Sequence, residues 1–162
     1  MTRTAFRSWF IIHRSSFPNT LNPDHTAPTM NLSKNVKLTL VQAGLADGQT
    51  DPDSSSVDMQ GFDGVMFVAI VGTITGVGTV TLTAEQSSDD GVADAFAALA
   101  SAAAVATAAA HSDKVLVLDV YRPQERYVRT ALTRAVANSV YGGTLAIQYC
   151  GRKRPTTHDA TS

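Results

Sequence analysis

The chain has 162 residues, of which 44% are hydrophobic and 17% are charged, with a formal net charge of −1. A length of this order fits one domain, and so small a net charge excludes binding of polyanions by bulk electrostatics alone. No apolar run approaches the roughly 18 residues that would span a membrane, so we expect no membrane partner. The single cysteine, Cys150, excludes an internal disulfide bond and a cysteine-based zinc site.

Residues 1–29 differ in composition from the rest of the chain. They contain a four-residue apolar patch, too short for a signal-peptide core, and the prolines Pro18, Pro23 and Pro28, which prevent a continuous helix or central strand. Met30 opens a stretch that reads as a natural start. Either translation begins there, or residues 1–29 form an extended or disordered arm that orders against neighbouring subunits.

Alternating patterns predict strands from residue 36 onward. Residues 36–42 place Val36, Leu38 and Leu40 on one face, as in a half-buried strand. Residues 64–71 are almost continuously apolar, which is typical of a strand buried on both faces. This run, a glycine-rich connector and a second alternating run at residues 79–85 together predict a hairpin.

The alanine-rich tract at residues 92–110 leaves two alternatives open. Intrinsic propensity favours helix, although part of the tract also fits a thin strand. We expect a helical turn near residues 93–99 and then an extended segment. Three further strand patterns follow at residues 115–120, 126–134 and 143–150.

About seven short strands without alternating long helices predict a mostly β fold, a single antiparallel β-sandwich of jelly-roll type. We expect this domain to comprise residues 30–151, followed by a short basic and threonine-rich tail at residues 152–162.

The chain carries no recognisable catalytic or metal-binding pattern. The acidic loop at residues 51–58 lacks the turn glycine and the bidentate glutamate of a calcium loop. The glycine-rich segment at residues 72–78 lacks the lysine of a phosphate-binding loop, and no Gly-x-Ser-x-Gly elbow occurs. The sequence therefore predicts a protein that is not an enzyme and that needs no cofactor and no metal.

Charge is unevenly spread along the chain. Residues 30–113 contain ten acidic residues and only two basic ones, Lys34 and Lys37, whereas residues 114–155 contain eight basic residues and two acidic ones. This split is either incidental or a sign of docking between unlike-charged faces. Arginine together with tyrosine is typical of protein–protein contact surfaces. We expect no nucleic-acid binding, because the arginines alternate between strand faces and stacking aromatic residues are few. The predicted interface residues are Tyr121, Arg122, Arg126, Tyr127, Arg129, Arg152, Lys153 and Arg154.

Three stretches carry a family resemblance. They are Asp-Met-Gln-Gly-Phe-Asp-Gly-Val at residues 58–65, Leu-Asp-Val-Tyr-Arg-Pro at 118–123 with Arg-Tyr-Val-Arg at 126–129, and Ala-Ile-Gln-Tyr at 146–149 with Arg-Lys-Arg-Pro at 152–155. In these stretches, between about residues 30 and 155, the chain resembles small structural proteins encoded in the virion gene clusters of tailed bacteriophages. Residues 1–29 depart from that pattern.

The resemblance implies a β-sandwich with a structural role in the phage particle. We expect a decoration, or cement, protein that forms a homo-oligomer and binds the major capsid protein. Its location would be the virion, after synthesis in the host cytoplasm. The alternative is a neck or tail component that forms a ring at the head–tail connection.

Overall fold

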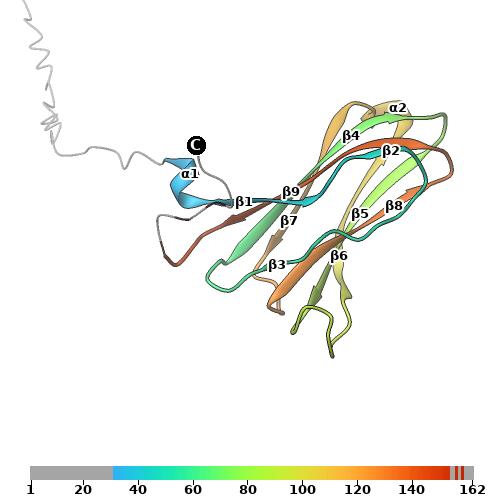
Figure 1. Cartoon of the computed structure of the whole chain (residues 1–162). Coiled ribbons are helices and arrows are strands. Elements are labelled where there is room, and N and C mark those ends of the chain that lie inside the picture. The colour runs from blue at the N-terminus through green and yellow to red at the C-terminus, as the bar shows by residue number, and fades with distance from the viewer. Residues whose placement is uncertain (1–30, 154–155, 157, 159–162) are drawn as a thin grey trace, which may run out of the picture.

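The computed structural model describes residues 31–153, 156 and 158, so the predicted arm at residues 1–29 and most of the predicted tail lie outside the described residues. Most of the described backbone is strand, arranged in two antiparallel sheets (Figure 1). Two short helices, α1 (Leu32–Asn35) and α2 (Ala108–His111), accompany the strands. Within the described part of the chain, no helix has the length and apolarity needed to cross a bilayer. The predicted mostly β, antiparallel architecture is confirmed.

Each sheet combines strands that are distant in sequence. Sheet A has the order β1-β9-β4-β7, with β2 also paired to β9, and sheet B has the order β3-β8-β5-β6. The strands of sheet A are β1 (Lys37–Gln42), β2 (Leu45–Gly48), β4 (Gly64–Ile74), β7 (Lys114–Tyr121) and β9 (Ser139–Tyr149). Those of sheet B are β3 (Val57–Asp58), β5 (Thr79–Ser87), β6 (Ala97–Thr107) and β8 (Tyr127–Ala135).

One hydrophobic core draws side chains from both sheets. Alternation along each strand turns every second residue inward, and these residues are almost completely buried. The core includes Val65, Phe67, Ala69 and Val71 of β4, Leu116, Leu118 and Val120 of β7, Val80, Leu82 and Ala84 of β5, and Val128 and Leu132 of β8. Burial of each large apolar side chain contributes about 1.5–3 kcal/mol to folding, which is why the two sheets hold together.

The predicted hairpin between residues 64–71 and 79–85 is wrong. β4 belongs to sheet A and β5 to sheet B, so the glycine-rich connector carries the chain from one sheet to the other. Gly76 adopts a φ of 56°, and the Gly78 N–H donates to the Thr75 carbonyl at 2.9 Å, which closes the turn. Such a turn can join two strands of one hairpin or carry the chain from one sheet to the other. The strands that β4 and β5 pair with determine which of the two connections forms.

Residues 97–107 of the alanine-rich tract form β6, and residues 108–110 belong to α2. The helical turn expected near residues 93–99 is therefore wrong, and the extended segment after it is confirmed. β6 pairs with β5 at the edge of sheet B, with Val105 opposite Thr81 and Ala104 opposite Leu82. Ala106 is fully buried in the core. Helix propensity is a weak preference, and the hydrogen bonds to β5 override it.

Two strands of sheet A bury fewer side chains than the sequence predicts. Leu38 and Leu40, expected on the buried face of β1, are 40% and 64% exposed, because β1 pairs with β9 in a register that turns both leucines to the outer face. Val41, on the opposite face of β1 from Leu40, lies in the core instead. β4 was expected to be buried on both faces, yet Ile70 on its outer face is 48% exposed.

A buried arginine joins the two sheets near the turn between β8 and β9. Arg134 is only 3% exposed, and its guanidinium donates to the carbonyls of Ala46, Thr50 and Ser139 at 2.8–2.9 Å. Its backbone N–H also donates to the Asp51 carboxylate at 2.6 Å. Five N–H donors in a rigid fork allow one side chain to satisfy three carbonyls from separate segments. No sequence feature distinguishes this arginine from the exposed ones.

Replacing Arg134 by methionine should lower the free energy of unfolding by about 2–4 kcal/mol, because a buried side chain loses its three hydrogen bonds and the carbonyl of the buried Ser139 loses its donor. Urea unfolding followed by circular dichroism measures the change. The matched control is Arg122→Met, since Arg122 is exposed and its replacement should change stability by less than about 0.5 kcal/mol. Equal losses for the two variants would contradict the structural role of Arg134.

Candidate protein-binding surfaces

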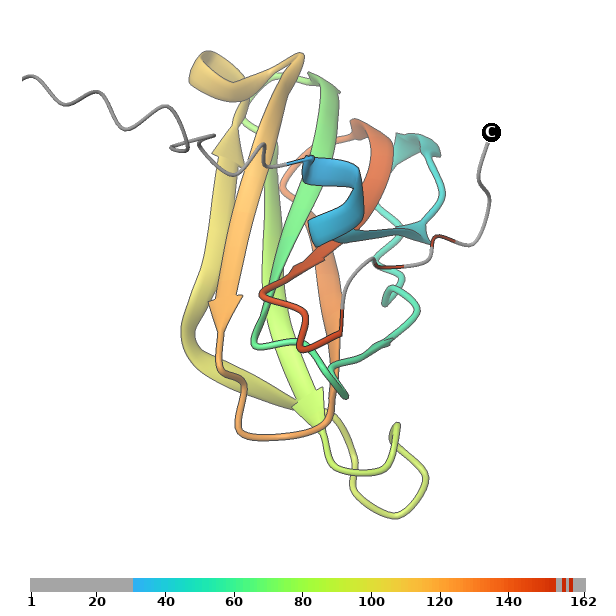
Figure 2. The ribbon, with the colours of Figure 1, turned by 90° about the vertical axis from the view of Figure 1, so that its left-hand side faces the viewer.

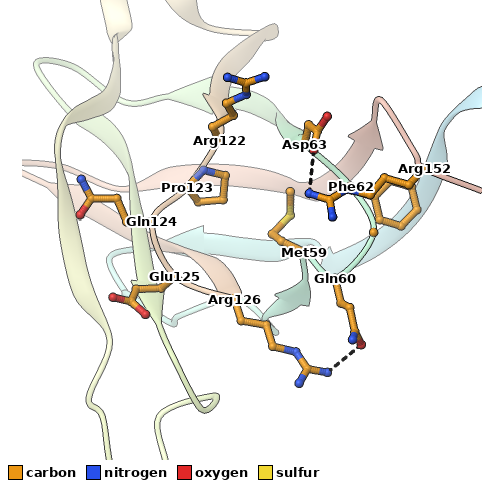
Figure 3. Close-up of a pocket in the computed structure, with 11 residues that line it drawn as sticks. Met59, Gln60, Phe62, Asp63, Arg122, Pro123, Gln124, Glu125, Arg126 and Arg152 are labelled. Atoms are coloured by element: carbon orange, nitrogen blue, oxygen red, sulfur yellow. Dashed lines mark hydrogen bonds and ion pairs between the residues drawn. The ribbon is translucent and has the colours of Figure 1, made fainter.

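Three chain segments meet at one end of the two sheets and line an open hollow of about 750 Å³ (Figure 3). They are the loop between β3 and β4, the loop between β7 and β8, and Arg152 after the end of β9. Met59, which is 6% exposed, lines the hollow together with Phe62 and Pro123, so part of its surface is apolar. The hollow combines apolar surface with guanidinium groups, as interface hot spots commonly do.

Backbone hydrogen bonds fix these segments to one another. The Arg122 N–H donates to the Asp63 carbonyl, the Met59 N–H to the Arg126 carbonyl, and the Arg152 N–H to the Gly61 carbonyl, each at 2.8 Å. Arg122 adopts a left-handed conformation, with φ of 53°, directly after the end of β7. Non-glycine residues adopt it at a cost, and the bond to Asp63 holds the loop there.

Arg126 is committed to an ion pair within the chain. Its Nε and Nη2 atoms donate to the two carboxylate oxygens of Asp58 at 2.9 and 2.7 Å, and Nη2 also donates to Gln60 at 3.2 Å. These hydrogen bonds hold the pKa of Asp58 below its ordinary value and raise the pKa of Arg126. Because both of its donor groups are already paired with Asp58, the Arg126 guanidinium holds the loop between β7 and β8 in place. It has little capacity left to bind another protein.

The guanidinium groups of Arg122 and Arg152 keep most of their hydrogen-bond donors available to a partner. Arg152 is 76% exposed, and its contact with the Asp63 carboxylate is long, at 3.5 Å. The Arg122 side chain lies over the ring of Tyr121, 5.2 Å from its centroid, and forms no hydrogen bond or ion pair with the described residues. Figure 3 shows Arg122 and Arg126 on opposite sides of the hollow. The two arginines available to a partner are therefore Arg122 and Arg152.

The structure brings together three of the predicted interface residues and places the others elsewhere. Arg129 is paired with Asp53 and Glu85, each at 2.8 Å, and covers the ring of Phe96, so it stabilises sheet B. Tyr127 is half-buried beneath Arg126. Lys153 borders a second hollow, which shares Phe62 and Arg152 with the first. Arg154 lies outside the described residues, and Tyr121 belongs to the surface described next.

The outer face of sheet A is a broad apolar surface. Cross-strand neighbours align in rows of apolar side chains. One row is Leu40, Leu145, Val68 and Val117, a second is Leu38, Ile147 and Met66, and a third is Ile70 and Val115. Leu40, Val115 and Val117 are more than half exposed. Contiguous apolar surfaces of this kind mark interaction sites more often than chance.

Two stacked tyrosines border this apolar face. The rings of Tyr121 and Tyr149 are nearly parallel, with centroids 6.5 Å apart. Only glycine fits at position 64 of β4, because a Cβ there would overlap the Tyr149 ring. The Tyr149 hydroxyl donates to Asp119 at 2.7 Å, and burial together with this hydrogen bond raises the pKa of Tyr149 above its ordinary value. Tyr149 therefore stays protonated and donates a hydrogen bond to Asp119, the one carboxylate in the rows of outer-face side chains.

Ion pairs within the chain neutralise part of the charge split seen in the sequence. The ion pairs that involve Arg126, Arg129 and Arg152 each join a base from the basic segment to an acid from the acidic segment. The docking of unlike-charged faces of neighbouring subunits stays a prediction. In the hollow, Arg122 forms no ion pair with the described residues, and the contact of Arg152 with the Asp63 carboxylate is long, at 3.5 Å.

Carboxylates elsewhere act as local structural groups. In the loop between β5 and β6, Asp89 accepts hydrogen bonds from the backbone N–H groups of Val92, Ala93 and Asp94, which lower its pKa. Such bonds stabilise the loop, as in other aspartate turns. Among the described residues, no group of three or more histidine, cysteine and acidic side chains could hold a metal ion.

Comparison with known proteins adds no relative: no protein-family model matches the chain, and no curated protein matches it. The resemblance to phage virion proteins therefore stays a prediction. Two surfaces of the described residues are suited to binding a protein: the hollow that contains the arginines and the outer face of sheet A.

Because of Asp58, the free energy of unfolding should decrease as the pH falls into the acid range. Because its pKa is lower in the folded state, its contribution is fully present above the unfolded pKa of about 4 and is lost as the pH falls through the folded value. Asp58→Asn should therefore lower the free energy of unfolding at pH 7 and flatten its decline below about pH 4. Thermal unfolding across this pH range tests the prediction, with Asp113→Asn as the exposed control. An unchanged pH profile for Asp58→Asn would contradict it.

Proposed function

We propose that this chain is a structural protein of a tailed-phage particle that binds the capsid shell as a decoration, or cement, protein. The single observation that carries the binding role is the meeting of Arg122 and Arg152 around a hollow with apolar walls. A guanidinium beside apolar surface suits a peptide segment that carries a carboxylate next to an apolar side chain. We therefore propose an acidic, exposed segment of the major capsid protein as the partner.

We also propose a single β-sandwich of jelly-roll type. Strand pairing supports it, because, when β2 is set aside, each strand pairs with the one equally far from the other end of the strand order. Thus β1 pairs with β9, β3 with β8, β4 with β7, and β5 with β6. One long hairpin rolled into two sheets produces this nesting, which is the jelly-roll arrangement of two Greek keys. Viral capsid and lectin domains both use this fold, so the fold supports the role without defining it.

The second candidate function is a neck or tail component of the same particle. A ring built by head-to-tail contacts needs two different surfaces on each subunit. The arginine hollow and the outer face of sheet A are chemically different, which is the observation that favours this alternative. The two functions differ sharply in the number of copies per particle, because a decorated shell needs hundreds of copies and a ring about six or twelve.

Quantitative mass spectrometry of purified particles, relative to the major capsid protein, decides between the two functions. The decoration role predicts hundreds of copies in a simple ratio to the shell protein, and a count of about six or twelve would assign the chain to the neck or tail. Absence from the particle would overturn both. In particles assembled with Arg122→Glu, we expect the copy number to fall at least about tenfold, because the reversed charge repels an acidic segment.

Lys114→Glu provides the matched control for that variant. Lys114 is also exposed and begins β7, whereas Arg122 directly follows its end, so the same charge change is made at the opposite end of one strand. The copy number of Lys114→Glu should equal that of the wild type. Equal loss for both variants would show that net charge matters and the hollow does not.

A further inference from the structure

We infer that a second copy of this chain covers the outer face of sheet A, in a two-fold contact that places this face against the same face of the partner. The inference goes beyond the proposed virion role and does not depend on it. It follows from the chemistry of the face, from its width and from the contacts at the edges of sheet A.

The outer faces of the two sheets differ in chemistry. In sheet A, the central row places Leu145, Val68 and Val117 side by side. In sheet B, the corresponding outer row contains Thr133 and Thr81, and only Val105 at the edge is apolar. A solvated sheet face normally carries polar side chains, as sheet B does. The face of sheet A is therefore built to be covered.

The face is wide enough to form the centre of an interface. Its side chains extend over four adjacent strands, and Leu40, Val115 and Val117 are more than half exposed. At about 4.8 Å between strands and about 3.3 Å per residue, such a face measures on the order of 20 Å in each direction, a scale suited to the centre of a standard interface of roughly 800 Å² per partner. Sheets pack face to face at about 10 Å when apolar side chains interdigitate. Stacking two copies on this face would extend the two-sheet fold to four layers.

The edges of sheet A are less available than its face. At β1, Thr156 donates from its hydroxyl to the Val36 carbonyl at 2.7 Å, and the Leu38 N–H donates to His158 Nδ1 at 3.4 Å. The tail thus occupies backbone groups at the start of this edge strand. At the other edge, β6 runs beside β7 (Figure 2). Because both edges lie against the chain's own segments, association by strand addition is disfavoured and the open face remains.

A second copy fits this face better than an unlike partner does. The rows contain one carboxylate, Asp119, and it is already hydrogen-bonded to Tyr149. The face therefore carries little charge that would repel an identical face or select an oppositely charged one. A two-fold contact needs only a self-complementary surface, and rows of similar apolar side chains provide it.

Sedimentation analysis of the full-length chain across a dilution series tests the inference. The wild type should form a dimer of 17.1 kDa subunits. Val117→Glu should weaken dimerisation at least about a hundredfold, because the contact would bury an unpaired carboxylate. The matched control is Val105→Glu, since Val105 is 52% exposed on sheet B and Val117 is 53% exposed on sheet A. This control should dimerise like the wild type.

Each other outcome overturns the inference. A wild type that stays monomeric, a trimer or larger ring, or a Val117→Glu variant that still dimerises would each exclude a two-fold contact through this face. Circular dichroism verifies that both variants fold. Should Val117→Glu fail to fold, Leu40→Gln, on the 64% exposed leucine of β1, repeats the test with a smaller change. Because no particle is involved, failure here leaves the copy-number test of the virion role intact.

Discussion

The apolar character of β4 on both faces is the constraint on which the rest of the structure depends. Its inner residues, such as Phe67, join the core between the sheets and are fully buried. Its outer residues, such as Val68 and Ile70, lie in the middle of sheet A with similar side chains on the neighbouring strands. The chain's second sheet can cover only one of these faces. The fold thus covers one apolar face of β4, and the inferred second copy would cover the other.

Much of the fold follows from local pattern, and its failures have identifiable causes. The apolar, β-branched run at residues 115–120 predicts β7 to within one residue at each end, because such runs favour strands. The alanine tract misleads, since alanine fits a helix or a thin strand and only pairing with β5 selects the strand. Leu38 and Leu40 mislead for a different reason. The register of β1 on β9 decides which face turns inward, and that register is a long-range property.

The sequence predicts which residue types form the candidate site, but it does not predict how they are arranged in space. The sequence identifies Arg122, Arg126 and Arg152 as surface arginines, and the structure places all three around one hollow. The sequence cannot show that Arg126 forms an ion pair with Asp58, because the two residues come together only when β3 pairs with β8. Arg134 shows the same limit in stronger form. Its sequence context is a strand like that of Arg129, yet it is buried and satisfies carbonyls instead of carboxylates.

The most direct test of this account measures whether the outer face of sheet A is covered when the full-length protein is at working concentration. Hydroxyl-radical footprinting with mass spectrometry reports the accessibility of individual apolar side chains. The account predicts that Leu40 and Val117 are oxidised far more slowly than Val105, although all three are more than half exposed in a single chain. Equal oxidation of the two valines would contradict it, because the outer face of sheet A would then be an ordinary solvated surface.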